Sequence, residues 1–286
     1  MPRPAPAAVA DRLPPQLLFV LGAISQYVGA ALAVLLFASV PAAGVAWLRV
    51  VAAAAVLVAW RRPWQTPWTA ARLRLTAAFG VALALMNLAF YLAIDRLPLG
   101  TAVAIEFVGP IAVAALGSRT PRDIGALVLA AGGVVALADV HLTGSPVGFA
   151  LAIAAGVLWA AYIVLGHRVA ADPGLRPVDG LALAMAIGAL ALAPALVWSA
   201  VPALVDPLLL AACLAVGVAS SVVPYGLEQI AMRRLPRARF ALLLALLPAT
   251  ATVIGAIVLG QIPGVIESTG IALIVVAASL RSHAEL

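Results

Sequence analysis

The sequence has no lysine, a single cysteine and few charges of either sign. Charged residues make up 10% of the 286 residues and hydrophobic residues 65%, whereas a soluble domain carries roughly 25% charged residues. This composition excludes a soluble globular protein. The lone Cys213 lies inside an apolar run, so it can form neither a disulfide within the chain nor a cysteine cluster for zinc. We interpret it as a small core residue.

Motifs typical of soluble enzymes are missing as well. The chain contains no Walker phosphate loop, no HExxH zinc motif, no Gly-x-Ser-x-Gly elbow and no CxxC pair. Its histidines, His141, His167 and His283, lie at or beyond the ends of apolar runs and form no ligand cluster. The sequence therefore predicts no catalytic residue, no cofactor and no metal site.

Long apolar runs, separated by Arg, Pro and Gly, fill most of the chain. A helix needs about 20 apolar residues to cross a bilayer, and the runs predict an all-α integral membrane protein with ten transmembrane helices. The expected helices cover 16–38, 41–60, 73–94, 98–117, 122–140, 147–167, 179–199, 208–230, 236–260 and 265–281. Ten such spans leave no room for an extramembrane domain.

The distribution of arginine predicts the orientation. If the amino terminus is cytoplasmic, fifteen of the 17 arginines fall in cytoplasmic segments, Arg96 lies outside, and Arg49 lies within a helix. Because positive residues concentrate on the cytoplasmic side of membrane proteins, we expect both termini to be cytoplasmic. We interpret the net charge of +6 as a topology signal, and we expect no nucleic-acid partner.

An internal repeat is visible at an offset of 138 residues. Arg96-Leu97-Pro98, with Pro110 beyond it, recurs as Arg234-Leu235-Pro236 with Pro248 at the same spacing. The matching segments lie five predicted helices apart, and since five is odd, the second half must be inverted relative to the first. We therefore expect two inverted five-helix repeats, 16–140 and 147–281, which is typical of secondary transporters with alternating access.

Two ionisable residues are predicted near the membrane midplane. Arg49 follows Pro41 by eight residues and Glu106 follows Pro98 by eight, which places both about 12 Å deep at 1.5 Å per residue. Buried charges cost about 2.5–3.5 kcal/mol each on insertion scales, so they usually face a cavity or a partner. The two residues are candidates for substrate binding or proton coupling; a structural ion pair, or a protonated Glu106 bonded between helices, is the alternative.

Polar and aromatic residues at helical spacing extend this candidate site. They could line a cavity and hold the amine and carboxylate of a small zwitterion, or they could equally hydrogen-bond or pack between helices. Pro110 and Pro248 lie inside expected helices and are candidate hinges, although proline is also tolerated in membrane helices. The candidate lining residues are Gln26, Asn87, Tyr91, Trp159, Tyr162, Tyr225 and Gln229.

Three segments resemble those of the EamA-type drug/metabolite transporter superfamily, and within it the threonine/homoserine exporter family. The matching residues are Met86–Ile94, Pro98–Pro110 with Ser118-Arg119, and Pro224–Glu228 with Arg234-Leu235-Pro236. The resemblance implies ten helices in two inverted halves. It also implies proton-driven export of small amino acids across the bacterial inner membrane. As partners we expect the small-molecule substrate and the lipid bilayer, with the protein a monomer or homodimer.

The sequence departs from that family at three positions. Similar exporters carry a Lys where this chain has Val34, an acidic residue where it has Leu247, and a Glu where it has Gln261. A cavity without the first two charges would suit larger amphipathic compounds, which is a rival hypothesis. An integral-membrane enzyme or a helical scaffold is the alternative outside transport, but an enzyme should show ionisable groups clustered at one membrane face, and we find none in the sequence.

Overall fold

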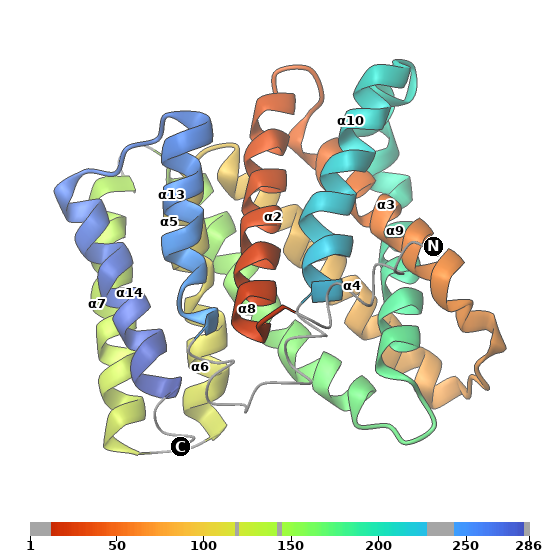
Figure 1. Cartoon of the computed structure of the whole chain (residues 1–286), viewed down its shortest axis with the longest axis horizontal. Coiled ribbons are helices and arrows are strands. Elements are labelled where there is room, and N and C mark those ends of the chain that lie inside the picture. Colours follow the sequence, from red (N-terminus) through yellow and green to blue (C-terminus); the bar gives the residue numbers. More distant parts are fainter. Residues whose placement is uncertain (1–12, 118–119, 142–144, 228–242, 283–286) are drawn as a thin grey trace.

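The computed structural model describes residues 13–117, 120–141, 145–227 and 243–282, and within these residues every regular element is a helix (Figure 1). Six helical segments are long and apolar enough to cross a membrane. The helices are α2 (Pro15–Leu36), α3 (Ala42–Arg61), α4 (Ala70–Ile94), α5 (Leu99–Glu106), α6 (Val108–Gly117), α7 (Pro121–His141), α8 (Pro146–Ala170), α9 (Pro177–Leu204), α10 (Pro207–Gly217), α13 (Leu247–Leu259) and α14 (Val265–Ser282). A short 3-10 turn, η1 (Pro63–Gln65), follows α3, and a π-helical turn, η2 (Val218–Val222), follows α10.

Local sequence explains where several helices begin and end. The Oδ1 atom of Asp206 accepts hydrogen bonds from the backbone N–H groups of Leu208 and Leu209 at the start of α10, satisfying donors that a helix leaves unpaired. Gly260 ends α13 with φ +67°, a left-handed conformation that glycine adopts without steric cost. Helix α9 runs to Leu204, five residues past its predicted end, and continues through Pro194 and Pro202.

The helices lie side by side in a bundle, with α7 and α14 at one edge and α3 and α9 toward the other (Figure 1). Helix α2 lies between them and packs against α13, α10 and η2. The larger apolar core surrounds α2 and includes Tyr27, Tyr91 and Ile105. A second core lies between α3, α4, α8 and α9 around Phe79, Leu83 and Met185.

Candidate functional site

Arg49 is buried on α3, with 5% of its surface exposed. Its Nε atom donates to Ser221 Oγ at 2.9 Å, and its Nη2 atom donates to the carbonyl of Ser220 at 2.9 Å. Helix α10 can approach so closely because of Gly217, where an added Cβ would lie 2.9 Å from the carbonyl oxygen of Arg49. The guanidinium is therefore fixed against the turn η2.

Tyr91 on α4 lies beside this guanidinium. The Arg49 Cζ atom is 5.1 Å from the centre of the Tyr91 ring, within the range of a cation–π interaction. The ring is fully buried and makes an edge contact with Phe37. Its hydroxyl is buried and has no hydrogen-bond partner among the described residues, an arrangement that costs about 1–3 kcal/mol. The ring of Tyr91 therefore lies over a buried arginine, while its hydroxyl is left unpaired among the described residues.

Glu106 lies at the last residue of α5 and is 8% exposed. Within the described chain, its carboxylate has no hydrogen-bond or ion-pair partner, although Arg49 attracts it through space. On α8, Gly156 lets the helices come close together, because an added Cβ there would lie 2.8 Å from the Glu106 carbonyl. Arg49 and Glu106 thus belong to one buried region but are not joined as a direct ion pair.

The chain is interrupted next to Glu106, where Phe107 separates α5 from α6. Pro110 lacks the N–H that would bond the Glu106 carbonyl in a continuous helix. Pro248, its counterpart in the repeat, lies in the first turn of α13, directly after a turn at residues 245–246. Both candidate hinge prolines therefore lie just beyond a break in helical structure.

The remaining predicted site residues fall into several groups. Trp159 makes an edge contact with Phe107, beside Glu106, with ring centres 5.3 Å apart. Asn87 is buried on α4, and its Nδ2 atom donates to the carbonyl of Leu83 within the same helix. Gln26 is half-buried on α2.

Tyr162 and Tyr225 pack against the second apolar core rather than against Arg49. Tyr162 stacks on Phe79 at 5.1 Å between ring centres. Gln229 lies outside the described residues. The structure therefore places the predicted aromatic pair of α8 in two different environments, with Trp159 against Phe107 and Tyr162 against Phe79.

Sequence reasoning missed Ser220 and Ser221, which hold the guanidinium of Arg49. The signal was two consecutive serines in an apolar run, shortly before Pro224. In an α-helix the N–H four residues after Ser220 would bond its carbonyl, but residue 224 is a proline and has none. That carbonyl is therefore left for a side chain.

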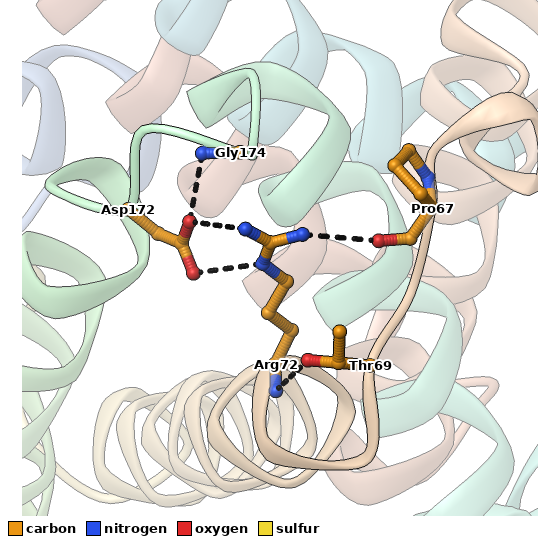
Figure 2. A network of polar contacts seen from close by, with 5 residues as sticks. All are labelled: Pro67, Thr69, Arg72, Asp172 and Gly174. Carbon is orange, nitrogen blue, oxygen red and sulfur yellow. Dashed lines mark hydrogen bonds and ion pairs between the residues drawn. The ribbon is translucent and has the colours of Figure 1, made fainter.

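Two ion pairs tie the segments at the arginine-rich end, which we define by Arg61, Arg62, Arg72 and Arg74. Arg61 Nε donates to Asp179 Oδ1 at 2.9 Å, which joins α3 to α9. Arg72 binds Asp172 through both carboxylate oxygens, each at 3.0 Å, and so joins α4 to the loop before α9. Figure 2 shows this network, in which Arg72 also donates to the carbonyl of Pro67 at 3.2 Å.

Asp172 responds to pH in a way that can be measured. Its hydrogen bond from Arg72, and next the backbone N–H of Gly174 at 2.8 Å, lower the pKa of the carboxyl. Stability from a depressed pKa is present above the unfolded value of about 3.9 and is lost as the pH falls through the folded value. We expect Asp172→Asn to lower the melting temperature near neutral pH, and we expect the difference from the wild type to shrink as the pH falls below the unfolded pKa and through the lower folded pKa. Asp95→Asn, in a pair of neighbouring residues that spans no helices, is the control; a gap that persists at low pH would contradict the prediction.

Contacts of another kind tie the far end, which we define by Pro98 and Gln261. The Oε1 atom of Gln261 accepts from the backbone N–H of Leu99 at 2.9 Å. Thr101 donates to the buried Glu267, which also accepts from the N–H of Gly264 at 3.2 Å. Thr101, Gln261 and Glu267 line a pocket of about 260 Å³ between α5, α13 and α14. Across the described part of the chain, no group of three or more His, Cys, Asp and Glu residues could hold a metal ion.

Comparisons with known proteins show to which family the chain is related. Residues 146–282 match the EamA-like transporter family. The threonine/homoserine exporter RhtA of Salmonella typhimurium (strain LT2) is 38% identical over 279 residues, covering 94% of this chain and 90% of that protein. RhtA of Escherichia coli (strain K12) is 40% identical over 242 residues, covering 82% and 79%.

A solved structure described as "Crystal structure of protein" has the same fold, with a TM-score of 0.58 and 22% identity over 93% of this chain and 96% of that one. The sequence relatives span most of the chain, and they are transporters rather than enzymes. The resemblance found in the sequence is thereby confirmed. This membrane protein belongs to the EamA-like transporter family.

Proposed function

We propose that this protein exports small amino acids, such as threonine and homoserine, across the bacterial inner membrane by proton-coupled alternating access. The names of the relatives support the substrate class. The observation that carries the proposal is the buried guanidinium of Arg49, which has no carboxylate partner among the described residues and lies over the ring of Tyr91, whose hydroxyl is unpaired within the described chain. A substrate carboxylate would satisfy both groups.

The two ionisable residues would then have different roles. Arg49 and Tyr91 would bind the carboxylate of the amino acid, and Glu106 would receive its ammonium group or a proton. Trp159, through its contact with Phe107, would lie beside the substrate. Gln26, Asn87 and Gln229 would extend the lining, and Tyr162 and Tyr225 would support it from the second apolar core. A carboxylate that alternately holds a substrate cation and a proton provides the exchange that a proton-driven exporter needs.

An inverted repeat would bring corresponding helices of the two halves together. Helix α3 packs against α9, α7 against α14, and α5 against α13, and each pair joins a helix to its counterpart five spans later. These contacts support ten spans in two halves, 16–140 and 147–281. Pro110 and Pro248 would be the hinges on which the halves rock, in a monomer or homodimer.

The function is tested with purified protein in liposomes under an imposed pH gradient. We expect export of threonine, homoserine and serine, with little movement of aromatic amino acids. The alternative is export of larger amphipathic compounds, which Val34 and the buried Leu247 favour because similar exporters are charged at those positions. Transport of such compounds without any amino acid would overturn the proposal and support this alternative.

The orientation is tested by labelling single cysteines in a Cys213→Ala background, since Cys213 is fully buried. Trp64 is 64% exposed at the arginine-rich end, and Ile262 is 85% exposed at the far end. We expect a cysteine at position 64 to react only from the cytoplasm and one at position 262 only from outside. Reaction of both from the same side would contradict the inverted architecture.

A further inference from the structure

The turn η2 exposes two successive backbone carbonyls to the first half of the chain. The N–H of Val223 bonds the carbonyl of Val218, five residues back, in π-helical rather than α-helical geometry. This leaves the carbonyl of Ala219 without its usual partner, and Pro224 leaves the carbonyl of Ser220 without one. π-helical turns inside α-helices frequently mark functional sites.

Side chains of α2 and α3 donate hydrogen bonds to both of these carbonyls. Ser25 Oγ donates to Ala219 at 2.7 Å, and Arg49 Nη2 donates to Ser220 at 2.9 Å. Ser221 Oγ accepts from Arg49 Nε at 2.9 Å. The turn therefore holds the guanidinium by hydrogen bonds along its Nε–Nη2 edge.

These hydrogen bonds leave the Nη1 edge of the guanidinium free to bind another group. Arginine carries five N–H donors in a planar fork, and Nη1 bonds no residue in the described part of the chain. Tyr91, with its unpaired hydroxyl, lies against this same side chain. A planar fork held on one edge is suited to meet a carboxylate with the other.

We propose that Ser221 and Pro224 are positioning residues that orient Arg49, so that its Nη1 edge selects substrates carrying a carboxylate. Pro224 acts by lacking an N–H, which reserves the Ser220 carbonyl for the arginine. Ser221 acts by accepting from Nε. This inference rests on the proposed export of amino acids and adds the residues that orient the arginine toward the substrate carboxylate.

The test compares threonine with threonine amide, in which a neutral carboxamide replaces the carboxylate. In Pro224→Ala the new N–H competes with Arg49 for the Ser220 carbonyl, and in Ser221→Ala an acceptor is removed. We expect each variant to raise KM for threonine by about tenfold, equivalent to the loss of roughly 1.4 kcal/mol, with kcat nearly unchanged. The preference for threonine over its amide should fall by a similar factor. Ser221→Thr, which keeps the hydroxyl, should restore the preference.

Pro194→Ala is the matched control. Pro194 also lies inside a helix, but the carbonyl that it leaves free belongs to Leu190, whose side chain is 73% exposed at the outer surface of the bundle. We expect this variant to keep the wild-type preference. If Pro224→Ala and Ser221→Ala lower the folded yield but keep the preference, the turn is only structural and the inference is wrong. If the wild type exports no amino acid at all, the proposed function fails, and the inference fails with it.

Discussion

Replacing Arg49 with Ala should lower export of threonine at low substrate concentration by about ten- to hundredfold. A hydrogen bond to a charged group contributes roughly 1.5–3 kcal/mol, and each 1.4 kcal/mol is a factor of ten. The substitution removes the positive charge that faces Tyr91, and it also leaves the Ser220 carbonyl without its donor. Initial rates in liposomes, normalised to folded protein, measure the effect.

Two further variants separate charge from geometry. Arg49→Lys keeps the charge but cannot reach two acceptors with one planar fork, so we expect a rate between those of the wild type and Arg49→Ala. Arg74→Ala removes an exposed arginine of α4 and should leave export unchanged. An Arg49→Ala protein that folds and exports threonine at the wild-type rate would remove Arg49 from the site.

Replacing Glu106 with Gln should abolish the response of export to an imposed pH gradient. Glutamine has the shape of the neutral acid but cannot exchange a proton. Because no described residue forms a hydrogen bond or ion pair with the Glu106 carboxylate, neutralising it breaks no direct contact, and the variant should fold. Downhill efflux of preloaded substrate should continue, while the stimulation by the gradient falls to zero.

Glu267→Gln is the matched control, since Glu267 is also 8% exposed but bonds Thr101 and the N–H of Gly264 at the far end. We expect this substitution to lower thermal stability and to keep the pH response. A pH response that survives in Glu106→Gln would exclude Glu106 as the coupling residue and leave it a substrate-binding role.

Apolar length predicted an all-helical membrane protein, and six helical segments of the described residues are long and apolar enough to cross a membrane. The end of α9 was misplaced by five residues, since Pro202 suggests a stop but the helix continues through it to Leu204. The break at Phe107 was also not expected within the predicted helix 98–117. Such details depend on how neighbouring helices replace missing backbone hydrogen bonds, and a hydropathy pattern does not contain that information.

The sequence predicted how deep Arg49 and Glu106 lie along their helices, but not which neighbours their side chains face. Counting from Pro41 and Pro98 placed Arg49 and Glu106 at one level, and both are buried in the structure. Depth along a helix says nothing about which neighbour a side chain faces. Arg49 bonds Ser220 and Ser221 because α3 packs closely on α10 at Gly217, which brings these serines next to the guanidinium.

Ion pairs join the helices at the arginine-rich end of the bundle, whereas hydrogen bonds from neutral donors join them at the far end. We therefore expect ionic strength to affect the two ends differently. Arg61–Asp179 and Arg72–Asp172 are pairs of full charges with partly exposed arginines, so added salt screens them. At the far end, Leu99 and Thr101 donate as neutral groups to Gln261 and Glu267, and salt affects such bonds far less. A rise in salt concentration therefore loosens one end selectively, and in an alternating-access cycle it would shift the resting population toward the form open at the arginine-rich end.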